Sequence, residues 1–271
     1  MDVKIGFKMT FAASMPTPMH LLLYVHPEIA SDLTHPEEIN ILSDSGIAVP
    51  IEDYVDFFGN KSARILAPAG RFTITYDNII SRSDDTEAVA LNAIQHNVEE
   101  LPVEALPFLL PSRYCEVDRF GDLAWKLFGN TNPGWERVQA ICDWVFENIK
   151  FGYPHTYPTK TAWDTYTEQN GVCRDFMHLA ITLSRSMNIP ARYATGYLGE
   201  IDVPASGSPM DFSAYMEVYL GGTWHTFDPR NHIRRVGRAL MARGRDAADA
   251  ALTTSFNDVL LKEFEVVTHR L

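Results

Sequence analysis

The chain has 271 residues, of which 46% are hydrophobic and 21% are charged. These proportions are typical of an ordinary globular protein, long enough for one large domain or two modest ones. A formal net charge of −12 argues against nucleic acid or an anionic membrane as the main partner. The N-terminus has no signal-peptide pattern, and no apolar run is long enough to span a bilayer.

The cysteines are three in number and widely spaced, at Cys115, Cys142 and Cys173. An odd, scattered set does not make a disulfide framework and favours a reducing compartment, so we expect a cytoplasmic protein. Metal-ligand spacings such as Cys-x-x-Cys and His-Glu-x-x-His are absent. The sequence therefore predicts no metal site and no cofactor.

The first part of the chain has the two-residue periodicity of half-buried β-strands. Apolar residues alternate with others from Val3 to Phe11 and again over residues 72–76, and residues 21–25 form a short apolar run. Phe58-Gly59-Asn60 separates two further strand-like segments, as a hairpin turn does. Short strands joined by Gly, Pro and Asn turns predict an antiparallel β-sandwich over residues 1–85.

After this segment the pattern becomes helical. Residues 86–110 are polar, acidic and then punctuated by proline, which indicates a linker. Asp118 is expected to cap a helix that runs to Phe128, and Asn132-Pro133 opens a longer one. Apolar positions in the longer helix form one stripe that includes Cys142, so this cysteine is expected in the core.

A third helix begins at a lone cysteine. Its apolar residues recur at helical spacing from Phe176 to Met187, and Asn188-Ile189-Pro190 ends it. Cys173 therefore lies in the first turn, where free N–H groups and the helix dipole favour a thiolate. Its pKa, about 8.5 in a free thiol, is expected to fall by roughly a unit or more. From position alone, the residue is equally compatible with a nucleophile and with a small buried apolar side chain.

Three strands follow this helix, at residues 192–198, 213–220 and 224–228. Gly221-Gly222 between the last two is a strong hairpin signal. Helices followed by neighbouring antiparallel strands predict an α+β arrangement for residues 111–271.

Residues Gly171–Leu198, together with residues 213–220 and 224–229, resemble the core of the bacterial transglutaminase-like superfamily. Members of this family are cysteine proteases, amidases or acyltransferases with a papain-like plan. Residues 54–60 and 67–70 resemble the N-terminal domain that precedes the core in bacterial relatives. The resemblance implies an N-terminal β-sandwich followed by helices packed on an antiparallel sheet, and a peptide or protein amide as substrate.

The family site combines a cysteine that opens a helix, a histidine that begins the next strand and an aspartate that ends the strand after it. Cys173 and Asp228 match this pattern, but the chain reads Ser213-Ala214-Tyr215 where the family usually reads His-Ala-Trp. The resemblance implies that the Cys173 sulfur faces the start of the Ser213 strand, with Asp228 on the neighbouring strand. Without its usual partner, Asp228 is expected to pair with Ser213, a histidine, Arg230 or water.

The serine leaves two functions open. One is a thiol-dependent hydrolase or acyltransferase that cleaves amide or peptide bonds through a Cys173 thioester, with an arylamine-type acetyltransferase as a weaker variant. The other is a non-catalytic binding module that has lost its base. A hydroxyl is too weak a base to replace imidazole near neutral pH, and general acid–base help is worth about 10²–10⁴ in rate.

Other histidines could supply the missing base. His178 is predicted to face away from the thiol on the same helix, where it would serve in packing. His225 and Asp228 lie three residues apart on one strand and so point to opposite faces. His232 lies in the loop after Asp228 and is the best candidate for a substitute base.

Five arginines crowd into residues 234–245. The favoured interpretation is a surface segment neutralised by nearby carboxylates such as Asp246 and Asp249. The alternative is an anchor for a substrate carboxylate, with Arg243 and Arg245 as its candidates, because guanidinium groups bind carboxylates bidentately.

Overall fold

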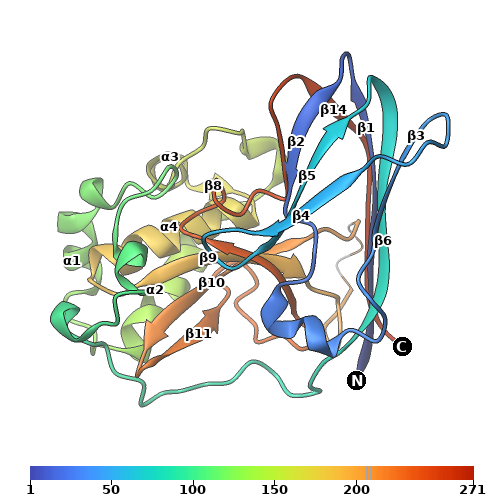
Figure 1. Ribbon diagram of the computed structural model, residues 1–271. Helices are drawn as coiled ribbons and strands as arrows, with labels where there is room; N and C mark the ends of the chain where they lie inside the picture. Colours follow the sequence, from blue (N-terminus) through green and yellow to red (C-terminus); the bar gives the residue numbers. More distant parts are fainter. Residues whose placement is uncertain (206, 208) are drawn as a thin grey trace.

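The computed structural model describes residues 1–205, 207 and 209–271 (Figure 1). Two four-stranded antiparallel sheets form a sandwich, with strand orders β14-β1-β6-β3 and β13-β2-β5-β4. Their strands are β1 (Asp2–Ala13), β2 (Thr17–Leu21), β3 (Ile39–Ser43), β4 (Ile51–Val55), β5 (Lys61–Ala67), β6 (Gly70–Ser81), β13 (Thr253–Ser255) and β14 (Val259–Arg270). A 3-10 helix, η1 (Pro27–Asp32), follows β2.

The sandwich forms as the alternating pattern predicted. Val3, Ile5 and Phe7 of β1 are buried in one core with Phe72 and Ile74 of β6. The strand predicted at residues 21–25 lies earlier, because β2 ends at Leu21 and the buried residues after it run in extended coil. The hairpin between β4 and β5 is present, with Val55 opposite Lys61.

The end of the chain returns to this sandwich. β14 pairs antiparallel with β1 along its length, and β13 pairs with β2. Figure 1 shows β14 beside β1, with the two termini close together. Residues 253–270, which the sequence grouped with the core, thus complete the N-terminal sheets. This pairing joins segments about as far apart in sequence as possible, so no local pattern indicates it.

The second layer is built around helix α4. The remaining elements are η2 (Val98–Glu100), η3 (Leu106–Leu109), η4 (Val117–Arg119), α1 (Gly121–Phe128), α2 (Trp135–Asn148), β7 (Lys150–Phe151), η5 (Tyr153–His155), α3 (Ala162–Glu168), β8 (Asn170–Gly171), α4 (Cys173–Ser186), β9 (Ala191–Tyr197), β10 (Ser213–Leu220), β11 (Thr223–Phe227) and β12 (Ala239–Gly244). The last four strands form an antiparallel sheet in the order β11-β10-β9-β12. Every residue of α4 from Asp175 to Ser186 is buried.

This sheet lies between the helices and the sandwich (Figure 1). Tyr193 and Met216 pack with the helices, whereas Tyr197 and Met241 belong to the core of the sandwich. Cys142 and Cys115 are both buried in the helical core. The predicted α+β fold, with an N-terminal antiparallel β-sandwich before helices on an antiparallel sheet, is confirmed.

In the helical half of the chain, the local sequence patterns predicted the structure correctly except at one helix cap. Gly221 and Gly222 both have positive φ, 59° and 88°, as a two-residue hairpin turn requires. Asp118 lies in the 3-10 turn η4 and does not cap α1, which begins at Gly121 without a side-chain cap. The predicted capping role was wrong because the chain turns once more before the helix starts.

The segment predicted as a linker is held against the core by backbone hydrogen bonds. The amides of Trp135 and Gly221 donate to the carbonyls of Ala93 and Ile94, at 3.1 and 2.9 Å. Phe108 is buried. No helix in the described part of the chain is both long and apolar enough to cross a membrane.

Candidate active site

The N-terminus of α4 is held by a buried carboxylate. Asp175 Oδ2 accepts from the Val172 amide at 3.0 Å, and its Oδ1 accepts from Arg174 Nε at 3.0 Å and Nη2 at 2.9 Å. The Asp175 side chain is completely buried. Cys173 is the first residue of this helix, so its sulfur is positioned by a well-fixed turn.

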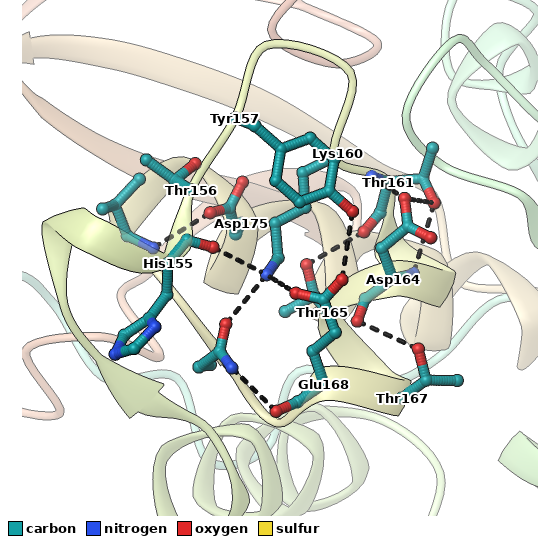
Figure 2. Close-up of polar contacts among 12 residues, drawn as sticks. His155, Thr156, Tyr157, Lys160, Thr161, Asp164, Thr165, Thr167, Glu168 and Asp175 are labelled. Carbon is teal, nitrogen blue, oxygen red and sulfur yellow. Dashed lines mark hydrogen bonds and ion pairs between the residues drawn. The ribbon is translucent and has the colours of Figure 1, made fainter.

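A buried lysine organises the loop that leads to Cys173 (Figure 2). Lys160 Nζ donates to the carbonyl of His155 at 2.9 Å, to Glu168 Oε2 at 2.5 Å and to Asn170 Oδ1 at 2.9 Å. Its side chain has no exposed surface. Asn170 and Gly171 then pair with β7, which places Gly171 next to Phe151. Sequence reasoning missed Lys160, since a lysine in a polar loop normally points to solvent.

A cavity of about 270 Å³ opens beside Cys173, and we call it the thiol cavity. Ser213, at the start of β10, lines it with Asp211 just before that strand. Most of the remaining lining is apolar or aromatic, with two arginines and a further acid: Phe151, Tyr153, Leu198, Glu200, Val203, Pro204, Pro209, Met210, Phe212, Arg230, Asn231, Ile233 and Arg235. The expected juxtaposition of Cys173 with the start of the Ser213 strand is thus present.

The environment of the sulfur raises the pKa of Cys173. Burial is the main cause, and the charge of Asp211 adds to it. The backbone N–H groups of Ala214 and Arg174 and the charge of Arg230 act in the opposite direction. The expectation of a lowered pKa was wrong, because removal of the thiolate from water outweighs the favourable dipoles at the helix start.

Asp228 follows β11 and has partners other than those predicted. Its Oδ1 accepts from the Asn231 amide at 2.9 Å, and its Oδ2 accepts from Asn231 Nδ2 at 2.7 Å and Arg238 Nη2 at 3.0 Å. The side chain is only 3% exposed. Neither Ser213, a histidine nor Arg230 bonds to this carboxylate among the residues described.

Asp228 lines a second cavity of about 630 Å³, which we call the aspartate cavity. Trp135, Cys142, Asp143 and His232 are also in its lining. Asp228 is absent from the residues that line the thiol cavity. The structure therefore places the matched cysteine and aspartate of the family pattern in different cavities.

His232, the candidate substitute base, lies at the aspartate cavity. His232 Nε2 is 2.7 Å from Asp143 Oδ1, and the imidazole stacks on Phe146 with ring centres 4.4 Å apart. His232 lines the aspartate cavity and not the thiol cavity. The structure thus does not bring this imidazole to the sulfur.

The other two histidines have packing roles. His178 is buried, stacks on Tyr114, and accepts from the Ala247 amide through Nε2 at 3.1 Å. Burial lowers its pKa to about 3, so it is neutral at physiological pH. His225 Nε2 lies 3.2 Å from the carbonyl of Leu220. Within the described lining of the thiol cavity there is no histidine.

The two arginines proposed from sequence as carboxylate anchors already have partners. Arg243 donates to Glu217 at 2.7 and 3.0 Å and also pairs with Glu28. Arg245 donates to Asp249 at 2.8 and 3.1 Å. Arg243 is also buried, so this part of the segment is not at the surface. Neither guanidinium lines the thiol cavity. Arg243 lies on β12 and is directed to Glu28 of η1.

No group of three or more His, Cys, Asp or Glu side chains within residues 1–205, 207 and 209–271 is arranged to hold a metal ion. The polar side chains that line the thiol cavity carry a thiol, a hydroxyl, a phenol, a carboxamide, two carboxylates and two guanidinium groups.

Comparison with known proteins places this geometry in a family. The family model described as "Transglutaminase-like superfamily" matches residues 122–229. A solved structure named "Putative Cysteine Protease from Cytophaga hutchinsonii" is 31% identical, with a TM-score of 0.83 over 99% of this chain and 90% of that one.

Two bacterial relatives are similar in sequence. Uncharacterized protein ML0607 of Mycobacterium leprae (strain TN) is 26% identical over 209 residues, 73% of each chain. Uncharacterized protein YebA of Bacillus subtilis (strain 168) is 27% identical over 180 residues, which are 59% of this chain and 23% of YebA. Neither name states an activity. The fold, the family model and the full-length structural match together show that the chain belongs to the transglutaminase-like superfamily.

Proposed function

We propose that the protein is a thiol-dependent hydrolase or acyltransferase that acts on amide or peptide bonds through a thioester on Cys173. The observation that carries the proposal is the position of Cys173, at a helix N-terminus and in the wall of a cavity large enough for a small acyl group. In the first step the sulfur attacks the amide carbonyl carbon, the C–N bond breaks, and the amine leaves with a proton. Water or another amine then attacks the thioester and releases the thiol.

Proton transfer in this scheme is assigned to Asp211. Its carboxylate lines the same cavity as Cys173, and its charge acts on the thiol. Burial raises the pKa of Asp211, which makes its carboxylate a stronger base than an exposed aspartate. Asp211 would take the thiol proton during attack and return it to the leaving amine. The Tyr153 hydroxyl, 3.5 Å from Asp211 Oδ2, orients the carboxylate.

The oxyanion of the tetrahedral intermediate needs donors. Free backbone N–H groups at the start of α4 are suited to this role, because they carry the positive end of the helix dipole. Ser213 would contribute only a hydrogen bond, since its hydroxyl is too weak a base.

One observation favours a non-catalytic binding module instead. The pKa of Cys173 is raised, and imidazole is missing from the described lining of its cavity. A thiol that stays protonated at neutral pH is a poor nucleophile. In this alternative the cavity would bind an amide ligand without cleaving it.

Two measurements on the Asp211→Asn variant distinguish the enzyme from the binding module. Loss of the negative charge lowers the pKa of Cys173, so alkylation by iodoacetamide at pH 7 should speed up, by about tenfold for each unit by which the pKa falls. Loss of the base should at the same time slow acetyl transfer from an anilide such as p-nitroacetanilide, whose leaving amine must take up a proton, by about 10²–10⁴. A structural role for Asp211 would move both rates in the same direction.

Cys173→Ala is the matched control. It should remove both signals, because Cys115 and Cys142 are buried. Mass spectrometry of the parent protein, quenched during turnover, should find the acetyl group on Cys173. If the parent chain forms no acyl-enzyme and cleaves no activated acyl donor, the binding module is the correct function.

A further inference from the structure

Two guanidinium groups line the thiol cavity, and neither has a carboxylate partner among the described residues. Arg235 is 8% exposed and donates from Nη2 to the carbonyl of Gly199 at 2.7 Å, while its Nε is buried without a hydrogen-bond partner among the described residues. Arg230 donates to Asn231 Oδ1 at 2.5 Å and lies over the Phe151 ring, 4.4 Å from its centre. Neither arginine forms an ion pair within the described part of the chain.

Three other arginines of the same segment do form ion pairs. Arg238 pairs with Glu87 at 2.6 Å and with Asp228 at 3.0 Å. Arg243 and Arg245 are paired with glutamate and aspartate, as described above. The two carboxylates whose charges act on Arg235, those of Asp228 and Glu87, are both bonded to Arg238. A buried cation without a directly bonded anion is costly, so a ligand anion at this position would be strongly stabilised.

The rest of the cavity limits what the ligand can be. Leu198, Met210 and Phe212 provide an apolar wall. Asp211 and Glu200 also line the cavity, so its charge is mixed and a ligand with several negative charges would be repelled. A volume of about 270 Å³ is slightly below the usual range of about 300–1,000 Å³ for small-molecule sites. The site suits a single small residue with one carboxylate.

We propose that the thiol cavity binds a substrate carboxylate at Arg235, with Arg230 assisting, so that the substrates are short peptides with a carboxylate beside the amide bond. The chemical step rests on the function proposed for Cys173, but binding of the carboxylate does not. The carboxylate could be the free C-terminus of an apolar residue or the side chain of glutamate. Guanidinium forks bind either group through two hydrogen bonds.

Binding is tested on the Cys173→Ala protein, which cannot turn over its ligand. The probes are N-acetyl-glycyl-leucine, its C-terminal amide, and N-acetyl-glutamate α-amide, in which only the side-chain carboxylate is free. Calorimetry should give an affinity for the acid at least about tenfold higher than for the leucine amide. Tight binding of the glutamate probe instead would assign the carboxylate to a side chain.

Variants identify the arginine responsible. Arg235→Met should abolish the preference for the acid, and Arg230→Met should reduce it. Arg245→Met, which removes an arginine that lies outside the cavity and pairs with Asp249, should leave it unchanged. Arg235→Lys keeps the charge but loses the fork, and it tests the site if Arg235→Met does not fold. Equal affinities for acid and amide, or a preference that survives in both Arg235 variants, would overturn the proposal.

The outcome is independent of the proposed chemistry. If the Cys173→Ala chain binds the acid but the parent shows no turnover, the carboxylate site is supported and the proposed enzymatic function is contradicted. If the parent turns over activated acyl donors but shows no preference for a carboxylate, the enzymatic function is supported and the carboxylate site is contradicted.

Discussion

The thiol cavity and the aspartate cavity share one segment of chain, residues 228–235. Arg230, Asn231 and Arg235 line the first, Asp228 and His232 line the second, and Ile233 lines both. The family pattern joins its cysteine and aspartate through a histidine at the Ser213 position. Here position 213 is a serine, and the two residues line different cavities.

The two cavities also differ in how their charges are satisfied. On the aspartate side, Asp228 is bonded to Asn231 and Arg238, and Asp143 to His232. On the thiol side, two guanidinium groups have no ion pair within the described part of the chain, and the thiol has a raised pKa. The difference suggests that Asp228 now serves stability, while the groups available for ligand binding are gathered around Cys173.

The largest expected effect is on stability, from Asp228→Asn. The change leaves the buried Arg238 with one carboxylate in place of two, and loss of a hydrogen bond between charged groups costs about 1.5–3 kcal/mol in the free energy of unfolding. Urea denaturation measures this loss. The alkylation rate of Cys173 should stay within about twofold of the parent rate. A stable variant with a strongly altered alkylation rate would mean that Asp228 acts on the thiol after all.

The next effect concerns the buried histidine on the Cys173 helix. The pKa of His178 is about 3 in the folded protein and near 6.5 when unfolded, so the unfolded state binds more protons between these values. Stability must therefore fall as the pH decreases from 6.5, by about 1.4 kcal/mol per unit from His178 alone. His26, whose burial lowers its pKa to about 4, contributes a similar slope down to that pH.

Unfolding free energies of His178→Asn and His232→Asn, measured from pH 6.5 to 5, separate the two histidines. The first variant should lose the part of the slope that comes from His178, leaving that of His26 and of His20, whose pKa burial also lowers. The second variant should retain the full slope. An unchanged slope in His178→Asn would show that this imidazole is protonated in the folded state.

A smaller effect is expected from restoring the family histidine. Ser213→His should place an imidazole in the thiol cavity and favour a thiolate–imidazolium pair, so alkylation of Cys173 near pH 6 should rise at least about tenfold. Adding Asp228→Asn to this variant tests whether the aspartate can still orient the imidazole. If the two histidine-containing variants react equally fast, the aspartate no longer participates. No rise at all would show that the histidine at position 213 does not reach the sulfur.

The smallest effect should come from His232→Ala. His232 and Asp143 are both partly exposed, so their pair contributes at most about 1 kcal/mol. Alkylation and acyl transfer by Cys173 should not change, because this imidazole lines the other cavity. Slower alkylation of Cys173 in His232→Ala would show that His232 is the substitute base and acts on the thiol from the other cavity.

The sequence alone determined the features that depend on nearby residues. The alternation along β1 and β6, the two glycines of the β10–β11 hairpin and the start of α4 at Cys173 are all local patterns. Each follows from the geometry of one strand, turn or helix. The resemblance then identified Cys173, Asp228 and the substitution at Ser213.

Only the tertiary structure decided the features that depend on distant residues. The pairing of β14 with β1, the burial of Lys160, the partners of Asp228 and the choice of Arg235 over Arg243 as a cavity residue all join remote parts of the chain. The direction of the Cys173 pKa shift belongs to the same group. A helix N-terminus is visible in sequence, but desolvation depends on everything packed around the sulfur, and here desolvation outweighs the dipole.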